Sequence, residues 1–392
     1  MAAAYAPAQL GPITLRNRVI KAATFEGVMP GGAVTQQLID YHLAVANGGV
    51  GLTTLAYCAV SKEGRVSADT LVFDASLVPD LTRFTDAIHA TGAKTSAQLG
   101  HAGLVAQAHS RRHPTVAPSP RLSAPAKGLV RGASHADMDE IVDQFARAAR
   151  VAVAAGFDAI EVHLGHNYLL SSFMSPNLNK RRDEFGGSVQ NRARFPRRVV
   201  AAVRGAVGDA PVAVLAKFNM DDGVARGLHV DESLQFALLL EADGHLDALE
   251  LTGGSSLLNG MYFFRGDVPL KEFAQTQGRL MAPAVRIYGR RIFPRLPFEE
   301  AFFLPMAREF RRELSMPLIL LGGINRAETI NAAIDDEGFA FVAMARALLR
   351  EPDLVNRFAT GESTAGVCSH CNKCMPTIYS GTRCVEREQR RS

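Results

Sequence analysis

The sequence predicts an α/β fold: a (β/α)8 TIM barrel with an inserted segment after strand six and a cysteine-rich C-terminal tail. Short runs rich in apolar and β-branched residues alternate with longer stretches of helical periodicity. Most of these runs are continuously hydrophobic, as parallel strands covered on both faces require. The eight near-equal repeats favour a barrel over an open doubly wound sheet, and no strand is followed by a Gly-x-Gly-x-x-Gly turn.

The predicted elements follow one another regularly along the chain. We expect strands at 18–24, 49–57, 93–99, 157–163, 211–218, 246–253, 317–323 and 338–345. Helical patterns occupy 35–49, 78–92, 139–156, 191–208, 231–244 and 326–338. Several helices end in glycine, which supplies a left-handed stop before the next strand. We therefore place the barrel in residues 1–360 and the tail in residues 361–392.

Two segments interrupt this rhythm. Residues 103–138 are loop-like and rich in proline and serine, whereas residues 254–312 combine aromatic and basic side chains. Insertions of this length are usually functional lids or disordered segments. The aromatic content of 254–312 disfavours disorder, so we expect a lid or a contact within a homo-oligomer.

Composition narrows the class of protein. The 392 residues are 47% hydrophobic and 21% charged, with a net charge of +4. Basic and acidic residues are mixed, which disfavours a nucleic-acid partner. No apolar run approaches the roughly 20 residues that span a bilayer, and the N-terminus lacks the layout of a secretory signal. We expect a cytoplasmic enzyme that acts on a small molecule.

Polar residues gather at the predicted strand ends, where a TIM barrel builds its active site. Gln98 offers a donor and an acceptor to a polar ring, and Lys217 offers a positive charge or, alternatively, a buried ion pair. The Gly322–Gly323 turn and Arg346 suit a phosphate, because exposed backbone N–H groups and a guanidinium bind anions.

The fourth strand ends in His163, His166 and Tyr168. The two histidines could ligate zinc, although no third ligand follows at the spacing that zinc proteases use. They could also be buried histidines with satisfied hydrogen bonds. A third reading has both imidazoles donate hydrogen bonds to a substrate carbonyl while Tyr168 supplies a proton.

The stretch "HLGHNYLLSSFMSPNLNKRRDEFGGSVQNRARF" (163–195) resembles the signature of Old Yellow Enzyme-type flavin oxidoreductases. The resemblance extends to "LGPITLRNRVIKAA" (10–23), "AQLGHAG" (97–103) and "MARALLREPDL" (344–354), and covers nearly the whole chain outside 254–312. It implies an FMN-binding barrel that passes a hydride from NAD(P)H to the activated C=C of an α,β-unsaturated carbonyl.

The resemblance also assigns roles to residues. It implies that Gln98 binds the pyrimidine edge of the flavin, that Lys217 lies near N1, that His163 and His166 hold the substrate oxygen, and that Tyr168 protonates the substrate. The cofactor-binding set that it implies is Ala22, Ala23, Thr24, Tyr57, Gln98, Lys217, Gly253, Gly322, Gly323, Ala345 and Arg346. Two departures stand out: Phe25 replaces a Thr or Cys, and Lys217 replaces an arginine.

The tail places Cys368, Cys371, Cys374 and Cys384 in a C-x2-C-x2-C-x9-C spacing, which strongly indicates a metal site. It is similar to the cysteine cluster of dienoyl-CoA reductase and trimethylamine dehydrogenase types, which hold a [4Fe–4S] cluster after the barrel. A cluster, a zinc ion and free thiols remain three readings. An alternative function follows: an oxidative demethylase or amine dehydrogenase that passes electrons through an iron–sulfur centre to an external carrier.

Overall fold

The predicted barrel is confirmed in the computed structural model, which describes residues 2–276, 289, 293–378 and 380–389. Eight parallel strands close in the order β10-β11-β12-β13-β3-β4-β5-β9. All eight lie inside or within two residues of the predicted ranges. The strands are β3 (Val19–Lys21), β4 (Leu52–Ala59), β5 (Lys94–Gly100), β9 (Ala159–Leu164), β10 (Ala213–Asn219), β11 (Ala248–Thr252), β12 (Leu318–Leu320) and β13 (Phe341–Met344).

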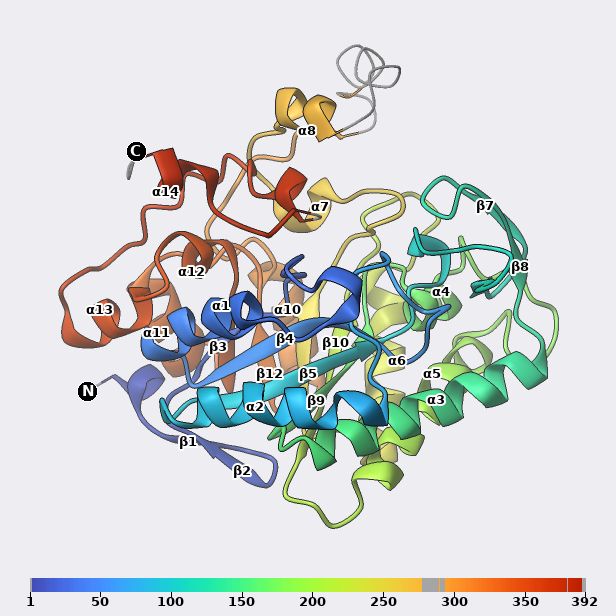
Figure 1. Cartoon of the computed structure of the whole chain (residues 1–392), viewed down its shortest axis with the longest axis horizontal. Helices are drawn as coiled ribbons and strands as arrows, with labels where there is room; N and C mark the ends of the chain where they lie inside the picture. The colour runs from blue at the N-terminus through green and yellow to red at the C-terminus, as the bar shows by residue number, and fades with distance from the viewer. Residues whose placement is uncertain (1, 277–288, 290–292, 379, 390–392) are drawn as a thin grey trace.

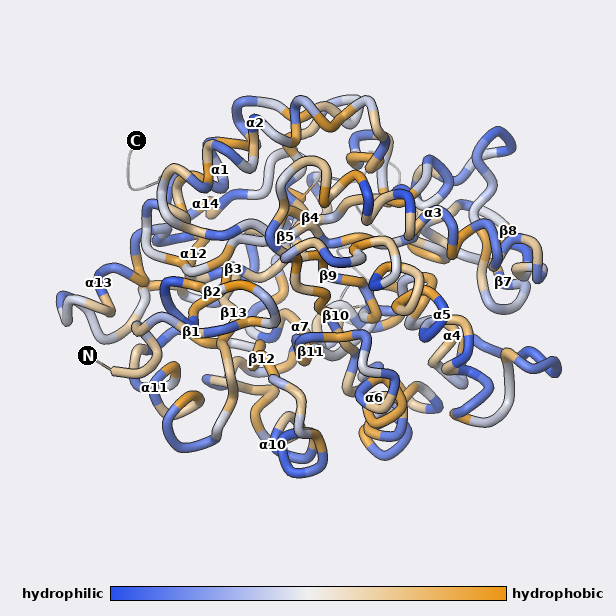
Figure 2. The backbone as a smooth tube through the Cα atoms, turned by 90° about the horizontal axis from the view of Figure 1, so that it is seen from below, coloured by the Kyte–Doolittle hydropathy of each residue, from blue (hydrophilic) through white to orange (hydrophobic). Residues whose placement is uncertain are grey.

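The strands are buried because helices cover the outside of the barrel and side chains fill its interior. Every residue of β4, β9, β10, β11, β12 and β13 is buried. In Figure 2 the central strands are largely hydrophobic, and the surrounding helices alternate between hydrophobic and hydrophilic residues. Continuous hydrophobic runs are therefore the correct signal for these strands.

The covering helices match the expected helical patterns. They are α1 (Gln36–Asn47), α2 (Val78–His89), α3 (His135–Ala154), α5 (Val189–Val207), α6 (Val230–Asp243) and α11 (Ala327–Asp335). The helix α3 begins four residues before the predicted start, because Ser134 and Asp137 form a capping box at its N-terminus. Two further helices, α12 (Arg346–Arg350) and α13 (Leu354–Thr360), follow the last strand.

The segment 254–312 divides into two parts. Its C-terminal end forms most of α10 (Leu304–Glu313), the helix that connects β11 to β12 on the outside of the barrel. The preceding residues carry two short helices, α7 (Met261–Phe264) and α8 (Leu270–Thr276), above the barrel mouth (Figure 1). Residues 277–288 and 290–292 of this segment lie outside the described residues.

Short strands occur in two places where no strand was expected. The hairpin of β1 (Ala8–Leu10) and β2 (Ile13–Leu15) contributes four apolar side chains to the core at the N-terminal end of the barrel. Within the loop-like segment 103–138, β6 (Val116–Ala117), β7 (Arg121–Ser123) and β8 (Gly128–Gly132) form a three-stranded sheet. Strands of two to five residues are too short to show a period.

The cysteine-rich tail lies over the barrel mouth beside α7 and α8 (Figure 1). It contains a short 3-10 turn (Met375–Thr377) and α14 (Val385–Gln389). The backbone N–H of Thr382 donates to the Glu26 carbonyl at 2.7 Å, and the N–H of Asp267 donates to the His370 carbonyl at 3.1 Å. The tail is thus tied both to the barrel and to the inserted segment. In the described part of the chain, no helix is long and apolar enough to cross a membrane.

Candidate active site at the mouth of the barrel

A cavity of about 290 Å³ opens at the C-terminal ends of the strands. Thirteen of the fourteen predicted catalytic and cofactor-binding residues line it. They meet there because the eight barrel strands are parallel, so their C-terminal ends lie at the same end of the barrel. They are Ala22, Ala23, Thr24, Tyr57, Gln98, His163, His166, Tyr168, Lys217, Gly322, Gly323, Ala345 and Arg346. The remaining residue, Gly253, is buried next to the cavity, and its backbone lies against Phe303 and Tyr262.

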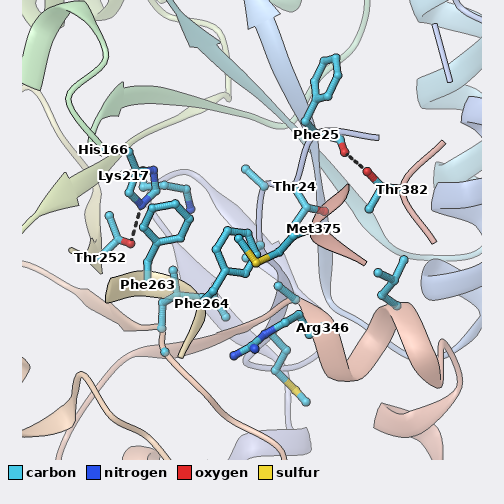
Figure 3. A pocket seen from close by; sticks show the side chains of 18 of the residues that line it. Thr24, Phe25, His166, Lys217, Thr252, Phe263, Phe264, Arg346, Met375 and Thr382 are labelled. Carbon is cyan, nitrogen blue, oxygen red and sulfur yellow. Dashed lines mark hydrogen bonds between the residues drawn. The ribbon is translucent and has the colours of Figure 1, made fainter. Parts of the chain in front are cut away.

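The three groups that end strand four cluster at one side of this cavity. The ring of His163 lies 4.5 Å from the Tyr168 ring and 5.3 Å from the His166 ring, measured between centroids. His166 Nε2 is hydrogen-bonded to Thr252 Oγ1 at 2.9 Å (Figure 3). His163 Nδ1 is buried without a hydrogen-bond partner. Because His163 also lines the cavity, this unpartnered nitrogen is a candidate for a hydrogen bond to a bound ligand.

Both imidazoles are neutral at physiological pH. Burial lowers the pKa of His163 well below its ordinary value, with His166 and Lys217 adding to the effect. Burial, with help from Lys217, lowers the pKa of His166 to about 3. A neutral imidazole has one donor and one acceptor nitrogen. Neither histidine belongs to a group of three metal-type ligand atoms in the described residues, which supports the donor reading over the zinc reading.

Lys217 forms the buried ion pairs that were one of its two expected roles. Its ammonium contacts the Glu250 carboxylate and lies 3.6 Å from Glu161 Oε1. Burial alone would lower the pKa of Lys217, but the two carboxylates outweigh it and raise the pKa. The lysine is therefore charged, and it still lines the cavity, where Figure 3 shows it beside His166. Gln98 also lines the cavity and donates to Glu161 Oε1 at 2.6 Å.

The phosphate-type end of the cavity is formed by the turns after β12 and β13. Gly322 and Gly323 have φ values of 117° and 76°, which side chains other than glycine rarely adopt. The Arg346 guanidinium donates to the Arg265 carbonyl at 3.0 Å and to Asn372 Oδ1 at 2.5 Å. Arg346 lines the same cavity as the glycine turn, so its positive charge and the backbone N–H groups of the turn are both available to an anion there.

The cavity fits an anionic flavin nucleotide. Its ionisable lining residues in the described chain are histidines, tyrosines, one lysine, one arginine and one cysteine, and none is Asp or Glu. Figure 3 shows Lys217 and Arg346 apart from one another in the cavity, as a ring system and a phosphate would require of two cationic groups. The unpartnered His163 Nδ1 leaves a hydrogen bond available to a second molecule.

Phe25 and Glu26 follow the first barrel strand, and each makes specific contacts. The Phe25 ring points away from the other labelled side chains in Figure 3, and its carbonyl accepts from Thr382 Oγ1. Glu26 is fully buried and contacts Lys21 at 3.2 Å and His42 at 3.1 Å. Buried charges of this kind are stable when paired, so Glu26 anchors the strand-one loop.

Several lining residues were not predicted. Thr252 holds His166, and the aromatic residues Phe263, Phe264 and Phe303 cover one wall. The tail adds His370, Cys374, Met375, Ile378 and Thr382. The aromatic content of the insertion was a visible signal for Phe263 and Phe264. No pattern in the sequence shows that the tail folds back over the barrel mouth.

The four tail cysteines line a second, small cavity of about 20 Å³. This cavity shares Arg346, Leu349, His370 and Cys374 with the larger one, so the two are separated by single side chains. None of the four cysteines is in a disulfide. Burial raises the pKa of the Cys374 thiol to about 12, while Arg346 opposes this effect. Cys58 is buried in β4, as expected for a packing residue.

The sulfur atoms of the four cysteines are widely spaced around this cavity. No three of them lie within 4.8 Å of one another in the described structure. A tetrahedral zinc ion with Zn–S bonds of about 2.3 Å needs sulfurs about 3.8 Å apart. An iron–sulfur cluster needs a wider arrangement, because its inorganic core lies between the ligand sulfurs.

Comparison with known proteins identifies the family. The model of the NADH:flavin oxidoreductase / NADH oxidase family matches residues 4–250. The chain belongs to this family. Members of this Old Yellow Enzyme family are flavin- and NAD(P)H-dependent oxidoreductases, so the protein is an enzyme of that class. The resemblance inferred from the strand-four motif is thereby confirmed.

Three known proteins illustrate what this chain is similar to. The 4,4'-dithiodibutanoate disulfide reductase of Rhodococcus erythropolis is 65% identical over 98% of this chain and 95% of its own length. A variant of morphinone reductase in complex with tetrahydroNAD is 26% identical, with a TM-score of 0.68 and coverage of 93% of each chain. A 2-naphthoyl-CoA reductase complex, at 22% identity, shares the fold with a TM-score of 0.82, and this chain spans 56% of that protein.

Proposed function

We propose that this oxidoreductase binds FMN in the barrel-mouth cavity and uses NAD(P)H to reduce a small anionic organic disulfide. The observation that carries the proposal is the cavity lining, which combines Lys217, Arg346 and neutral histidines with no acidic side chain among the described residues. Such a lining favours an anionic cofactor and an anionic substrate. The 65% identity to a disulfide reductase, over nearly the full length of both chains, supports the substrate class.

Bound FMN would supply hydride transfer from NAD(P)H to the acceptor. In this proposal Gln98 and Lys217 hold the flavin ring, while Arg346 and the amides of Gly322 and Gly323 hold its phosphate. Ala22, Ala23, Thr24 and Ala345 complete the cofactor wall as small residues that allow close approach. Gly253 stays outside this wall in the structure, and its proposed role is to let Phe303 and Tyr262 pack closely.

The acceptor is proposed to lie against His163, His166 and Tyr168. One sulfur of the disulfide takes the hydride, the S–S bond breaks, and the second sulfur leaves as a thiolate. Tyr168 gives this thiolate its proton and regains one from solvent, so one NAD(P)H and one proton yield two thiols. The N–H groups of the neutral imidazoles are suited to stabilise the negative charge on the leaving sulfur.

A second acceptor class is an activated alkene. The centroids of two neutral imidazole rings lie 5.3 Å apart, beside a tyrosine that can deliver a proton. This arrangement suits an α,β-unsaturated carbonyl, with His163 and His166 on the oxygen and Tyr168 protonating the α-carbon. The same three side chains would therefore serve both reactions.

The experiment that tests the proposal compares acceptors in one assay. FMN-loaded enzyme is mixed anaerobically with NADH or NADPH, and oxidation of the nicotinamide is followed with 4,4'-dithiodibutanoate or with cyclohexenone. Faster turnover with the disulfide supports the proposal, and turnover with the enone alone replaces it with alkene reduction. A variant with all four tail cysteines changed to serine is the control, because free thiols could exchange with the disulfide without flavin.

One observation favours the alternative function, an amine dehydrogenase or oxidative demethylase: the two cavities are close together. Arg346, Leu349, His370 and Cys374 separate the flavin cavity from the cysteine cavity, so electrons would travel a short distance to the tail. An amine dehydrogenase or demethylase that feeds an external electron carrier would use such a path. Reduction of the bound flavin by an amine, with an artificial acceptor and no NAD(P)H, would replace the reductase proposal.

We propose further that the four tail cysteines ligate one [4Fe–4S] cluster. Their shared cavity and the spread of their sulfurs beyond zinc-type distances support it. The test is iron, sulfide and zinc analysis together with an anaerobic visible spectrum of the purified protein. About four irons and four sulfides per chain support a cluster. One zinc per chain, or no metal, supports the other two readings.

A further inference from the structure

Four buried polar side chains form a connected group beneath the cavity. Gln98, Glu161, Lys217 and Glu250 lie on the neighbouring strands β5, β9, β10 and β11, and each is at most 4% exposed. Glu161 and Glu250 each precede a cavity residue by two positions, His163 and Thr252, respectively. Since alternate residues of a strand share a face, the two glutamates lie one layer deeper in the barrel.

The glutamates reach the cavity only through other side chains. Lys217 and Gln98 line it, whereas Glu161 and Glu250 are not among its described lining residues. The Lys217 ammonium contacts Glu250 and lies 3.6 Å from Glu161 Oε1, and Gln98 donates to that same oxygen at 2.6 Å. Each carboxylate therefore contacts a residue that is itself proposed to contact the flavin ring.

The charges of this group do not balance when both carboxyls are ionised. Two carboxylates and one ammonium leave a net charge of −1 in the barrel interior, where an uncompensated charge is costly. Lys21, whose charge also interacts with Glu161, is already engaged by Glu26. His163, above the group, is neutral. Two carboxyls that share one site resolve this imbalance by holding one proton between them.

The electrostatics agree with this geometry. Burial raises the pKa of Glu161 to about 8. The positive charge of Lys217 opposes this rise. The negative charge of Glu250 and the hydrogen bond between the two carboxyl groups add to it. One proton on the pair makes the group of three ionisable residues neutral. Loss of that proton gives it the charge of −1.

We propose that Glu161 and Glu250 share one proton and act as positioning residues that set, through Lys217 and Gln98, the charge presented to the flavin ring. This inference rests on the proposed FMN site. When two electrons from NAD(P)H place negative charge above Lys217, a fully ionised pair takes up one proton from solvent. The proton neutralises one carboxylate, so the charge of Lys217 becomes available to the ring.

The test measures the midpoint potential of the bound flavin against pH, followed by flavin absorbance, in wild type, Glu161→Gln and Glu250→Gln. Glu161→Gln is expected to raise the potential above a pH of about 8, where the wild-type pair loses its proton. Well below that pH the variant and the wild type are expected to coincide, because both groups are then neutral. Glu250→Gln is expected to flatten the pH dependence similarly, because it removes the partner with which Glu161 shares the proton.

Asp158→Asn is the matched control. Asp158 lies just before β9 at the opposite end of the barrel, where it contacts His89 and Lys94. Its removal is expected to lower stability without a pH-dependent shift in the potential. A shift of equal size at every pH in Glu161→Gln and Glu250→Gln would overturn the inference, since a purely structural role predicts that result.

A second measurement needs no flavin. Infrared spectra of the protein without added cofactor are expected to show a protonated carboxyl at neutral pH that Glu161→Gln removes, and absence of this signal overturns the inference. The two proposals fail separately. Flavin-loaded enzyme that reduces neither disulfide nor enone contradicts the proposed function alone, whereas an active enzyme without the pH-specific shift contradicts only the shared proton.

Discussion

At the scale of single residues, the surroundings of each buried histidine decide whether it serves ligand binding or structure. His163 and His166 are both kept neutral by burial, so each can donate one hydrogen bond into the cavity. His42 is likewise buried and pairs with Glu26, away from the cavity. The same residue type therefore serves binding at one place and structure at another, according to what surrounds it.

The proposed role of Tyr168 predicts a selective kinetic defect. Tyr168→Phe keeps the ring that packs 4.5 Å from His163 but removes the proton. Reduction of the acceptor is expected to slow by about 10²–10⁴-fold, the usual contribution of a positioned acid. Reduction of the flavin by NAD(P)H should stay near the wild-type rate in stopped-flow experiments. Equal loss in both half-reactions would contradict the proton-donor role.

Burial of neutral histidines also predicts sensitivity to acid. Burial lowers the pKa of His101 to about 4, and His101 Nε2 has no hydrogen-bond partner. An unfolded histidine takes up a proton near pH 6.5, so the stability that depends on a neutral His101 is lost as the pH falls from about 6.5 towards 4. For Glu161, whose pKa is raised by burial, the dependence is opposite: its contribution to stability is lost as the pH rises.

A variant isolates this effect. In urea unfolding, His101→Gln is expected to lose less stability than wild type on acidification, by about 1.4 kcal/mol per pH unit below 6.5. His229→Gln is the control of opposite sign, because the hydrogen bond that His229 Nδ1 donates to the Asp221 carboxylate raises the pKa of His229. Parallel pH curves for His101→Gln and wild type would contradict this prediction, because they would show that the pKa of His101 is the same in the folded and unfolded states.

At the scale of elements, the inserted segment and the tail are joined through one side chain. The amide of Asn372 donates to the carbonyls of Arg265 and Asp267, both at 2.9 Å, and its oxygen accepts from Arg346. Asn372 is 1% exposed. It therefore connects three elements: the residues after α7, the start of α12 and the cysteine tail.

This connection predicts a local loss of protection. Asn372→Ala removes one of two acceptors of Arg346 and one of two donors to the Arg265 carbonyl, and it removes the side-chain donor to the Asp267 carbonyl, at an expected cost of about 1–3 kcal/mol. Hydrogen exchange is expected to accelerate in residues 261–267 and 366–375, while the barrel strands keep their protection. Asn356→Ala, which removes an exposed bond to the Asn47 carbonyl, is the control. Unchanged exchange in both segments would contradict the connection.

At the scale of the whole molecule, the tail completes the cavity that the barrel begins. His370, Cys374, Met375, Ile378 and Thr382 line it, although they follow the last barrel strand by more than twenty residues. A chain that ends at residue 365 is expected to keep its barrel circular dichroism and to bind FMN at least about tenfold more weakly, a loss of about 1.4 kcal/mol.

The control for this truncation separates the polypeptide from any metal. The variant with all four tail cysteines changed to serine keeps the other residues that cover the cavity. FMN affinity near the wild-type value in this variant, measured by fluorescence quenching, together with weak binding by the truncated chain, would assign the effect to the polypeptide. Equal affinity of the truncated and full-length chains would contradict a role of the tail in cofactor binding.

The sequence by itself determined the barrel and most of its site. Parallel strands covered on both faces must be continuously apolar, so each strand was visible as a hydrophobic run, and its last residues were known to face the cavity. This reasoning located Gln98, His163 and Lys217 without any knowledge of distance. Gly253 was expected at the same strand ends, and it lies outside the lining of this cavity with Phe303 and Tyr262 as neighbours.

Only the tertiary structure decided which groups act together. The contacts of Lys217 with Glu161 and Glu250 depend on the register between three strands, and a one-residue change in register would separate them. The contact of the tail with residues 25–26 and 265–267 joins segments that are distant in the chain. Periodicity describes only near neighbours, so the roof of the cavity and the shared carboxyl pair emerge only once the chain is folded.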